Sequence, residues 1–226
     1  MFARATKLKL ICVTATGTNN IDLEAAKQSG VVVCNIRDYC TESVVQHVLL
    51  SILTLMHSFK DYSDSIESGD WQDGKSFSLL QHPIAELSGK SIGILGYGVL
   101  GQGVARAAAT LGLNVLVCES FAKDKKPDED LKRISFEAFL TESDIISLHC
   151  PLTDNTEGLF DENAFKKMKS SAILINTARG GLINDDALIK ALQNKKIYAA
   201  GLDVFNNEPV SYTHLRAHET REDLVW

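Results

Sequence analysis

Three glycines in the segment GILGYGVLGQG have the spacing G-x-G-x-x-G, at Gly96, Gly98 and Gly101. The first glycine permits a tight turn, the second lets the backbone approach a phosphate group, and the third lets a helix pack closely on the preceding strand. Backbone N–H groups of Val99 and Leu100 would then face an anion at the start of that helix. The segment predicts a pyrophosphate-binding turn for a dinucleotide, although a purely structural glycine-rich turn has the same spacing.

An acidic residue, Glu119, lies eighteen positions after Gly101 and directly follows the apolar run NVLVC. A carboxylate at this position can accept hydrogen bonds from the hydroxyl groups of an adenosine ribose. Its negative charge would also repel a phosphate group on the ribose 2′ oxygen. We therefore expect NAD as the cofactor rather than NADP.

These residues are positioned by short apolar runs that alternate with amphipathic helical segments, a pattern typical of a parallel α/β sheet. Strands are expected over residues 91–96, 114–118, 131–134, 144–149, 172–176 and 197–203, and helices over 99–111, 161–167 and 185–193. Six strands are the number that a dinucleotide-binding fold with two halves requires. The expected fold class is therefore α/β, with a doubly wound, parallel Rossmann sheet.

A shorter strand–helix–strand segment is expected before this sheet. Strands at 8–13 and 31–34 flank a helix that Asp22 would begin and Gly30 would end. Thr41 then begins a long helix whose apolar residues recur at helical spacing. The looser, polar pattern after it predicts a helix end followed by an extended arm.

Composition restricts the class of protein. Hydrophobic residues make up 45% of the 226 residues and charged residues 23%, so a folded chain is expected. The net charge of −6 disfavours nucleic acid as a partner, and no apolar run is long enough to cross a membrane. We expect a cytoplasmic protein with no metal site, and reduced, mostly buried thiols at Cys12, Cys34, Cys40, Cys118 and Cys150.

Four motifs in sequence order, GILGYGVLGQG, SLHCPLTDNTEGL, INTARGGLI and GLDVFNNEP, resemble the D-isomer-specific 2-hydroxyacid dehydrogenase family. The resemblance runs from about Leu8 to Pro209, and SFSLLQHPIAELSGKSIGI is more similar to glycerate dehydrogenases (hydroxypyruvate reductases) than to phosphoglycerate dehydrogenases. It implies a partial, flavodoxin-like substrate domain at 1–40 and an NAD-binding domain at 41–209, including the linking helix and the arm 61–88. It also implies a homodimer, although the apolar side of the long helix is equally consistent with ordinary core.

The resemblance implies two catalytic residues. Arg179 matches the family's substrate-binding arginine, whose planar guanidinium can grip a 2-keto acid through two oxygens and polarise its carbonyl group. Glu208 matches the acidic partner of a catalytic histidine, where a carboxylate orients the imidazole ring so that it can donate a proton. Outside this motif, a glutamate before proline is most often a solvated loop acid.

Further positions match binding residues of the family. Thr16 and Gly17 resemble a loop whose backbone N–H groups bind the substrate carboxylate together with Arg179. Asp203 resembles the residue on the nicotinamide carboxamide side of the cofactor. The resemblance implies a cofactor site lined by Gly96, Gly98, Val99, Leu100, Gly101, Glu119, Cys150, Thr177, Ala178 and Asp203.

Two departures from the family pattern bear on activity. Gly96 comes early, so we expect the chain to begin inside the substrate domain. The tail 210–226 is unlike the family's continuation toward a general-acid histidine, and His214 and His218 lie too near Glu208 to match it. We expect a tail of foreign origin and little or no turnover, and no catalytic role for the other histidines, His47, His57, His82 and His149.

The function expected from these residues and from the resemblance is NAD-dependent interconversion of small 2-keto acids and D-2-hydroxy acids. The leading substrates are hydroxypyruvate and glyoxylate, which would be reduced to D-glycerate and glycolate. Two alternatives remain. A non-catalytic, NAD(H)-sensing protein of the corepressor kind can keep the same motifs, and a D-3-phosphoglycerate dehydrogenase would act on a related substrate.

Overall fold

The computed structural model describes residues 2–18, 20–74, 76–122, 131–208 and 224–225, and the chain divides into two compact units, Met1–Thr41 and Glu42–Trp226. In the first unit, the 3-10 helix η1 (Phe2–Arg4) precedes β1 (Leu10–Val13), α1 (Leu23–Gln28) and β2 (Val32–Asn35), and the two strands pair in parallel. Asp22 begins α1 as predicted, because its carboxylate accepts a hydrogen bond from the N–H of Ala25. Gly30 ends the helical segment with a φ of +65°.

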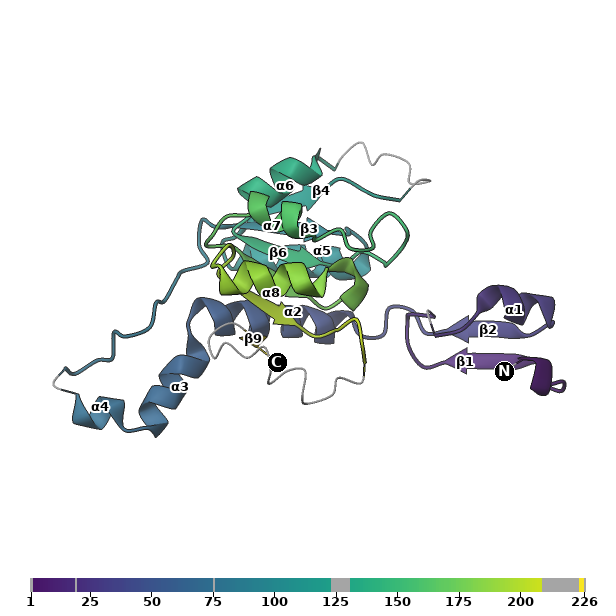
Figure 1. The fold of residues 1–226 in the computed structure, drawn as a ribbon, viewed down its shortest axis with the longest axis horizontal. Helices are drawn as coiled ribbons and strands as arrows, with labels where there is room; N and C mark the ends of the chain where they lie inside the picture. The colour runs from purple at the N-terminus through teal and green to yellow at the C-terminus, as the bar shows by residue number, and fades with distance from the viewer. Residues whose placement is uncertain (1, 19, 75, 123–130, 209–223, 226) are drawn as a thin grey trace. The chain divides into compact units, whose positions relative to one another are not determined.

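The second unit contains a parallel sheet with the strand order β5-β4-β3-β6-β7-β8-β9 (Figure 1). Its strands are β3 (Ser91–Leu95), β4 (Asn114–Cys118), β5 (Arg133–Ile134), β6 (Ile145–Leu148), β7 (Ile173–Asn176), β8 (Ala199–Leu202) and β9 (Leu224–Val225). Without β9, the order from β5 to β8 is the 3-2-1-4-5-6 order of the dinucleotide-binding fold. The predicted doubly wound Rossmann sheet is therefore confirmed, and β9 is a strand that the sequence pattern did not predict.

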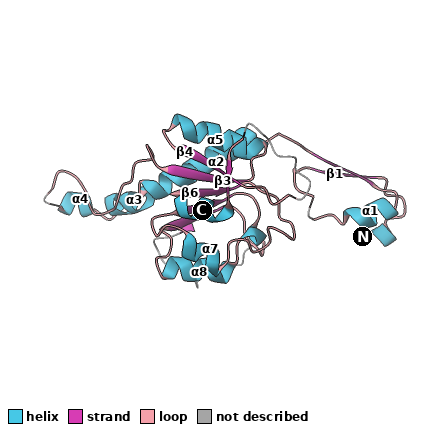
Figure 2. Ribbon diagram, turned by 90° about the horizontal axis from the view of Figure 1, so that it is seen from above, coloured by secondary structure: helices cyan, strands magenta, loops and turns pink. Residues whose placement is uncertain are grey.

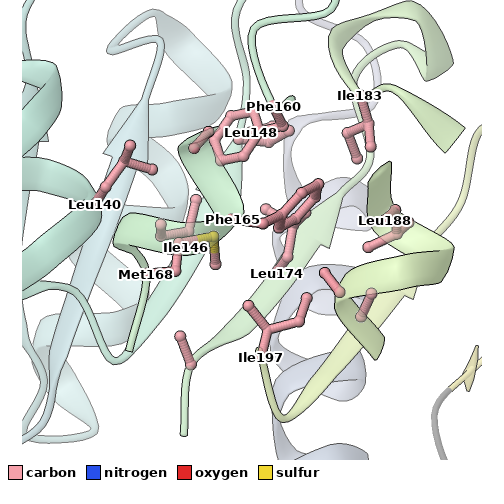
Figure 3. Close-up of a cluster of buried hydrophobic side chains, with 14 of the residues drawn as sticks. Leu140, Ile146, Leu148, Phe160, Phe165, Met168, Leu174, Ile183, Leu188 and Ile197 are labelled. Atoms are coloured by element: carbon pink, nitrogen blue, oxygen red, sulfur yellow. The ribbon is translucent and has the colours of Figure 1, made fainter. Parts of the chain in front are cut away.

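Helices cover both faces of this sheet (Figure 2). One face packs against α2 (Thr41–Met56) and α5 (Val99–Thr110), and the other against α6 (Phe136–Glu142), α7 (Glu162–Lys167) and α8 (Asp185–Gln193). Figure 3 shows the hydrophobic core between the sheet and the helices α6, α7 and α8. In this core, Phe165 and Leu188 lie near Leu174 of β7, a strand in the interior of the sheet. Every residue of β6 and β7 is buried, which explains their continuous apolar sequences.

The predicted extended arm is wrong over its first part. The structure has two further helices there, α3 (Phe59–Glu67) and α4 (Asp70–Asp73). His57 and Ser58 separate α3 from α2, and Ser58 has a φ of +46°. The returning chain holds α3, because the Tyr62 hydroxyl donates to the carbonyl of His82 at 2.8 Å and the His82 ring packs edge-on against Tyr62. This contact joins residues twenty positions apart, and a local apolar pattern does not reveal it.

The prediction that the cysteines are mostly buried is also wrong. Cys118 and Cys150 are buried, Cys40 is partly exposed, and Cys12 and Cys34 are exposed. The last two lie on β1 and β2, where exposed and partly buried residues alternate. Each strand therefore has one exposed side, and its mainly apolar sequence does not reveal that side. None of the described helices is long and apolar enough to cross a membrane.

Candidate functional site

The candidate site lies where four neighbouring strands end. Leu95, Leu148, Asn176 and Leu202 form one register row across β3, β6, β7 and β8. The residues that follow this row are Gly96, His149, Thr177 and Asp203, and the predicted cofactor residues among them are Gly96, Thr177 and Asp203. The strand order reverses at β3, between β4 and β6, which is the switch point where open α/β sheets bind ligands.

Two glycines of the G-x-G-x-x-G segment are required by backbone packing. Gly96 has a φ of +94°, and a Cβ there would overlap the backbone of His149 and Cys150. A Cβ on Gly101 would overlap the carbonyl group of Gly96. These two positions let the turn lie against the end of β6 and let α5 pack on the turn, as predicted.

Gly98 differs from the other two glycines. Its φ of −89° is open to any residue, and a Cβ built on it would meet no described protein atom within 4 Å. As the N-cap of α5 it has no side chain to bond the first N–H groups of the helix, which belong to Val99, Leu100 and Gly101. The positive end of the helix dipole therefore faces open space beside a residue without a side chain, a geometry that suits a phosphate group.

Glu119 follows β4, next to the strand that leads into Gly96, and its side chain is exposed. One carboxylate oxygen, Oε1, accepts a hydrogen bond of 2.6 Å from the N–H of Phe136 at the start of α6. The sequence did not predict this bond, because α6 itself was not among the expected helices. The bond fixes the carboxylate at the strand end.

Two titratable groups, the partly buried His149 and the buried Cys150, lie between the glycine turn and β7. Burial lowers the pKa of His149 to about 4, and its Nε2 lies 2.9 Å from the hydroxyl oxygen of Ser147. Burial raises the pKa of the Cys150 thiol to about 11. His149 is therefore neutral and Cys150 protonated at neutral pH, which leaves both without an acid or nucleophilic role and supports a lining position.

The turn that follows β7 carries Arg179. The fully buried side chain of Asn176 holds this turn at two points, since Nδ2 donates to the carbonyl of Arg179 at 2.9 Å and Oδ1 accepts from the N–H of Ala178 at 3.0 Å. The Arg179 guanidinium donates to the carbonyl of Ala178 at 2.6 Å. Asn176 is a positioning residue that the sequence analysis missed, because the strand-end asparagine was assigned only to the strand.

The segment with Glu208 crosses the Arg179 turn. A Cβ on Gly180 would overlap the backbone of Phe205 and Asn206, so these two segments meet at a position where only glycine fits. Asn206 strengthens the contact, because its Nδ2 donates to the carbonyl of Ile183 at 3.2 Å and to the carboxylate of Asp185 at 2.7 Å. The motif with Arg179 and the motif with Glu208, which are far apart in sequence, are thereby brought together near the end of β7.

Glu208 itself is exposed and closes a short turn. Its Oε1 accepts a hydrogen bond of 2.7 Å from the N–H of Phe205. In the described part of the chain, no histidine is hydrogen-bonded to this carboxylate; His82 and His149 contact Ser65 and Ser147 instead. His214 and His218, for which no role was predicted, lie outside the described residues, as do Pro209 and most of the tail.

Asp203 has a partner that sequence reasoning dismissed. Its Oδ1 lies 3.7 Å from Nε2 of His47, which projects from α2. His47 was assigned no role because it lies on a mainly apolar helix. The register of that helix, with Val44 and Val48 on the covered side, leaves His47 at the boundary between core and solvent.

Thr16 and Gly17 lie in the first unit, after β1. The side chain of Asn35, at the end of β2, donates a hydrogen bond of 2.7 Å to the carbonyl of Thr16. This bond ties the loop after β1 to the neighbouring strand. Thr16 is exposed and Gly17 is partly buried.

The strand-end residues fit a dinucleotide. In addition to the open space at Gly98, the hydroxyl oxygen of Thr177 is buried and has no hydrogen-bond partner among the described residues. A buried hydroxyl without a partner costs free energy, and a polar ligand at the strand ends would supply the missing bond. The aligned N–H groups of α5, this hydroxyl and Glu119 together offer donors and an acceptor for phosphate, amide and ribose groups.

Comparison with known families gives a match over most of the chain. The model of the D-isomer specific 2-hydroxyacid dehydrogenase NAD binding domain matches residues 49–221. The glycerate dehydrogenase of Methylorubrum extorquens is 44% identical over 89% of this chain, and the hydroxypyruvate reductase of Blautia hydrogenotrophica is 35% identical over 93%. The chain spans 62% and 65% of the length of these relatives, less than two thirds of each.

Solved structures agree with the sequence relatives. A D-lactate dehydrogenase from Aquifex aeolicus, complexed with NAD and lactic acid, is similar with a TM-score of 0.83 and 30% identity, covering 99% of this chain and 70% of that one. A glyoxylate reductase from Paecilomyes thermophila has a TM-score of 0.81 and 30% identity, covering 97% of this chain and 65% of that one. The similarity therefore extends from sequence to backbone arrangement.

Proposed function

The chain belongs to the D-isomer specific 2-hydroxyacid dehydrogenase family, and from that premise we propose that it serves hydride transfer between NAD(H) and small 2-keto or D-2-hydroxy acids. The observation that carries this proposal is that the cofactor-binding and substrate-binding residues lie at one edge of the sheet, formed by the carboxyl ends of β3, β6, β7 and β8; we call it the shared strand edge. The open backbone at Gly98, the buried hydroxyl of Thr177 without a described partner and the guanidinium of Arg179 all follow strands that end at this edge. Cofactor-binding and substrate-binding groups would thus be held by one rigid element.

Different residues would bind different parts of the cofactor. The N–H groups at the start of α5 would bind the pyrophosphate, with Gly98 allowing its close approach. Glu119 would accept hydrogen bonds from the ribose hydroxyls through Oε2, since Oε1 is bonded to Phe136. Thr177, Ala178 and Asp203 would contact the nicotinamide end, and Cys150 would line the cleft through its backbone. The reduced cofactor supplies the hydride when bound.

Arg179 is the proposed substrate residue. Its backbone is fixed by Asn176, so the guanidinium extends from a rigid turn rather than from a mobile loop. A guanidinium can donate two parallel hydrogen bonds to the carboxylate and carbonyl oxygens of a 2-keto acid. The same charge stabilises the alkoxide that develops as the carbonyl carbon accepts hydride.

Glu208 is the proposed partner of a proton-donating histidine. The bond from Phe205 orients its carboxylate, and the glycine crossing at Gly180 keeps the segment close to the Arg179 turn. A histidine held by such a carboxylate can protonate the developing alkoxide. The two neutral groups at the strand ends, His149 and Cys150, are unsuited to this step because burial disfavours the charged form of each.

For the substrate, we propose hydroxypyruvate or glyoxylate. The support is the names of the relatives: glycerate dehydrogenase, hydroxypyruvate reductase and, at 36% identity, the glyoxylate reductase of Thermococcus litoralis. D-3-phosphoglycerate dehydrogenase of Archaeoglobus fulgidus is 35% identical and keeps the phosphorylated substrate as a second candidate. Turnover with NADH and each of the three keto acids, hydroxypyruvate, glyoxylate and 3-phosphohydroxypyruvate, would rank them.

The substrate role of Arg179 is tested by binding, which does not depend on the proton donor. Oxamate, a non-reducible analogue of a 2-keto acid, is titrated into the protein saturated with NADH, and the nicotinamide fluorescence is followed. Arg179→Ala should weaken oxamate binding at least about tenfold, because hydrogen bonds to a charged group are worth ~1.5–3 kcal/mol. NADH binding should be unchanged. The control, Arg106→Ala, removes the same charge from the exposed side of α5; equal oxamate affinity in the two variants would contradict the assignment.

We also propose that the protein is a homodimer. Large apolar side chains are exposed along α2, α3, α4 and the chain that follows them: Leu50, Phe59, Trp71, Phe77 and Leu80, the last two at 93% and 84%. A concentration of large exposed apolar side chains in one stretch of sequence favours association between copies. Light scattering coupled to size exclusion should give twice the chain mass, and Phe59→Ser with Trp71→Ser should shift it to the monomer.

A further inference from the structure

Two cysteines occupy one register position in the first unit. In the parallel pair β1–β2, Cys12 is the direct partner of Cys34, with Leu10 opposite Val32 on the same side of the strands. Both thiols are free and both side chains are exposed. Nothing in the proposed hydride-transfer site uses either residue.

The spacing of adjacent strands sets the distance between these two cysteines. Neighbouring strands lie about 4.8 Å apart, so register partners have Cα atoms inside the 4.4–6.8 Å range that a disulfide spans. The alternation of exposure along both strands puts the two side chains on the same side, which no described residue buries, whereas Ile11 and Val33 lie on the other side. The pair therefore has the separation, the direction and the access that thiol–disulfide chemistry requires.

The other cysteines do not compete for the same reaction. Cys118 and Cys150 are buried in the core of the second unit, and burial raises the pKa of their thiols to about 12 and about 11. Such thiols hold little thiolate at neutral pH and react slowly. Cys40 is partly exposed but has no cysteine partner in a paired strand.

We propose that Cys12 and Cys34 form a vicinal dithiol that small-molecule disulfides oxidise to a reversible intrachain bond. One thiolate attacks the oxidant, for which glutathione disulfide is the probe, and forms a mixed disulfide with release of one glutathione. The second thiolate attacks that cysteine sulfur and releases the other glutathione. Two protein thiols lose their protons and electrons, one oxidant disulfide becomes two thiols, and the new bond joins β1 to β2. Because the bond is exposed, dithiothreitol reverses it.

Mass spectrometry tests the pairing on the full chain. The protein is incubated with excess glutathione disulfide, quenched with acid and N-ethylmaleimide, and digested with trypsin without reduction. Cleavage after Lys27 and Arg37 puts Cys12, Cys34 and Cys40 in three different peptides. We expect the Cys12 and Cys34 peptides to be linked, with the linked mass lower by two hydrogen atoms and no glutathione on either. Cys12→Ser and Cys34→Ser should each keep one glutathionyl group on the remaining partner.

A matched control moves one thiol without changing its exposure. In the double variant Val32→Cys, Cys34→Ser, the new thiol lies on the same exposed side but about 8 Å diagonally from Cys12, beyond the reach of a disulfide. This variant should carry glutathione on both cysteines and no link. Glutathione on both Cys12 and Cys34 of the unaltered chain, unreacted thiols at both, or an equal yield of linked peptide in the control would each overturn the pairing.

Discussion

The side chain of Asn176 is hydrogen-bonded to the carbonyl oxygen of Arg179 at 2.9 Å and to the N–H of Ala178 at 3.0 Å. Asn176 is the last residue of β7 and is fully buried. Its amide therefore holds the turn with the proposed substrate residue, Arg179, in a fixed position relative to β7. A strand with bonded neighbours on both sides, β6 and β8, is among the most rigid elements available for this purpose.

Asn176→Leu should destabilise the protein and loosen the turn. The change keeps the branching of the side chain at Cγ but leaves the Ala178 N–H and the Arg179 carbonyl without their buried partner, at a cost of about 1–3 kcal/mol for each unsatisfied group. Urea unfolding followed by circular dichroism measures the loss, and oxamate binding should weaken in the fraction that remains folded. The control is Asn194→Leu, whose amide bonds only the exposed end of α8. Equal unfolding free energies for the two variants would contradict the proposal that the Asn176 side chain holds the Arg179 turn.

The three glycines of the turn should respond differently to alanine. Gly96→Ala and Gly101→Ala place a Cβ inside neighbouring backbone, so each should lower the unfolding free energy by on the order of 3 kcal/mol. Gly98→Ala meets no protein atom and should leave stability unchanged or slightly raised. Its NADH affinity should nevertheless fall by about tenfold or more, because the methyl group occupies the space in which the pyrophosphate would lie.

This contrast separates a structural glycine from a ligand-binding one. Stability is read from urea unfolding, and affinity from NADH fluorescence, on the same preparations. A Gly98→Ala protein that binds NADH as tightly as the unaltered chain would show that the open space at the start of α5 is not the phosphate site.

Glu119→Gln should reduce discrimination between NADH and NADPH. The glutamine oxygen can still accept the bond from Phe136, whereas the charge that repels a 2′-phosphate is lost. We expect the ratio of the NADPH to the NADH dissociation constant to fall about tenfold, which corresponds to about 1.4 kcal/mol. Glu142→Gln removes an equal charge at the end of α6 and serves as the control. An unchanged ratio in Glu119→Gln would assign the discrimination to other residues.

His149 should make stability depend on pH. Its pKa of about 4 in the folded protein lies below its ordinary value of 6.5, so the unfolded chain binds the proton more readily at intermediate pH. The stability is complete above pH 6.5 and is lost as pH falls toward 4, with a loss of about 2 kcal/mol between pH 7 and pH 5. His149→Gln should remove this part of the slope, and His57→Gln, at an exposed position, should keep it. Parallel slopes for all three proteins in urea unfolding would contradict this assignment.

Local sequence patterns predicted the sheet well for physical reasons. β6 and β7 are covered on both faces, so their apolar runs are uninterrupted. Helices begin at Asp22, Asp161 and Asn184, because the side-chain oxygen of each accepts a hydrogen bond from the backbone N–H three residues later. The glycine turn was predictable because Gly96 and Gly101 satisfy steric demands that any member of the fold meets.

The parts that sequence did not reveal depend on contacts between distant residues. Asn176 forms its bonds only after the chain turns, Gly180 is required only because Phe205 crosses it, and α3 is held by His82. His47 lies near Asp203 because α2 packs beside β8, and the sequence of α2 alone indicated only an apolar helix. The exposed Cys12 and Cys34 were mistaken for core because their neighbours are apolar.

The central claim is that the shared strand edge binds NAD, and the most direct measurement is a titration of the protein with NADH and, in parallel, NADPH, followed by fluorescence. The account predicts a dissociation constant on the order of micromolar for NADH and much weaker binding of NADPH. Circular dichroism on the same sample verifies that the chain is folded. A folded chain that binds neither nucleotide, or binds both equally, would contradict the assignment of Gly98, Thr177 and Glu119 to the cofactor site.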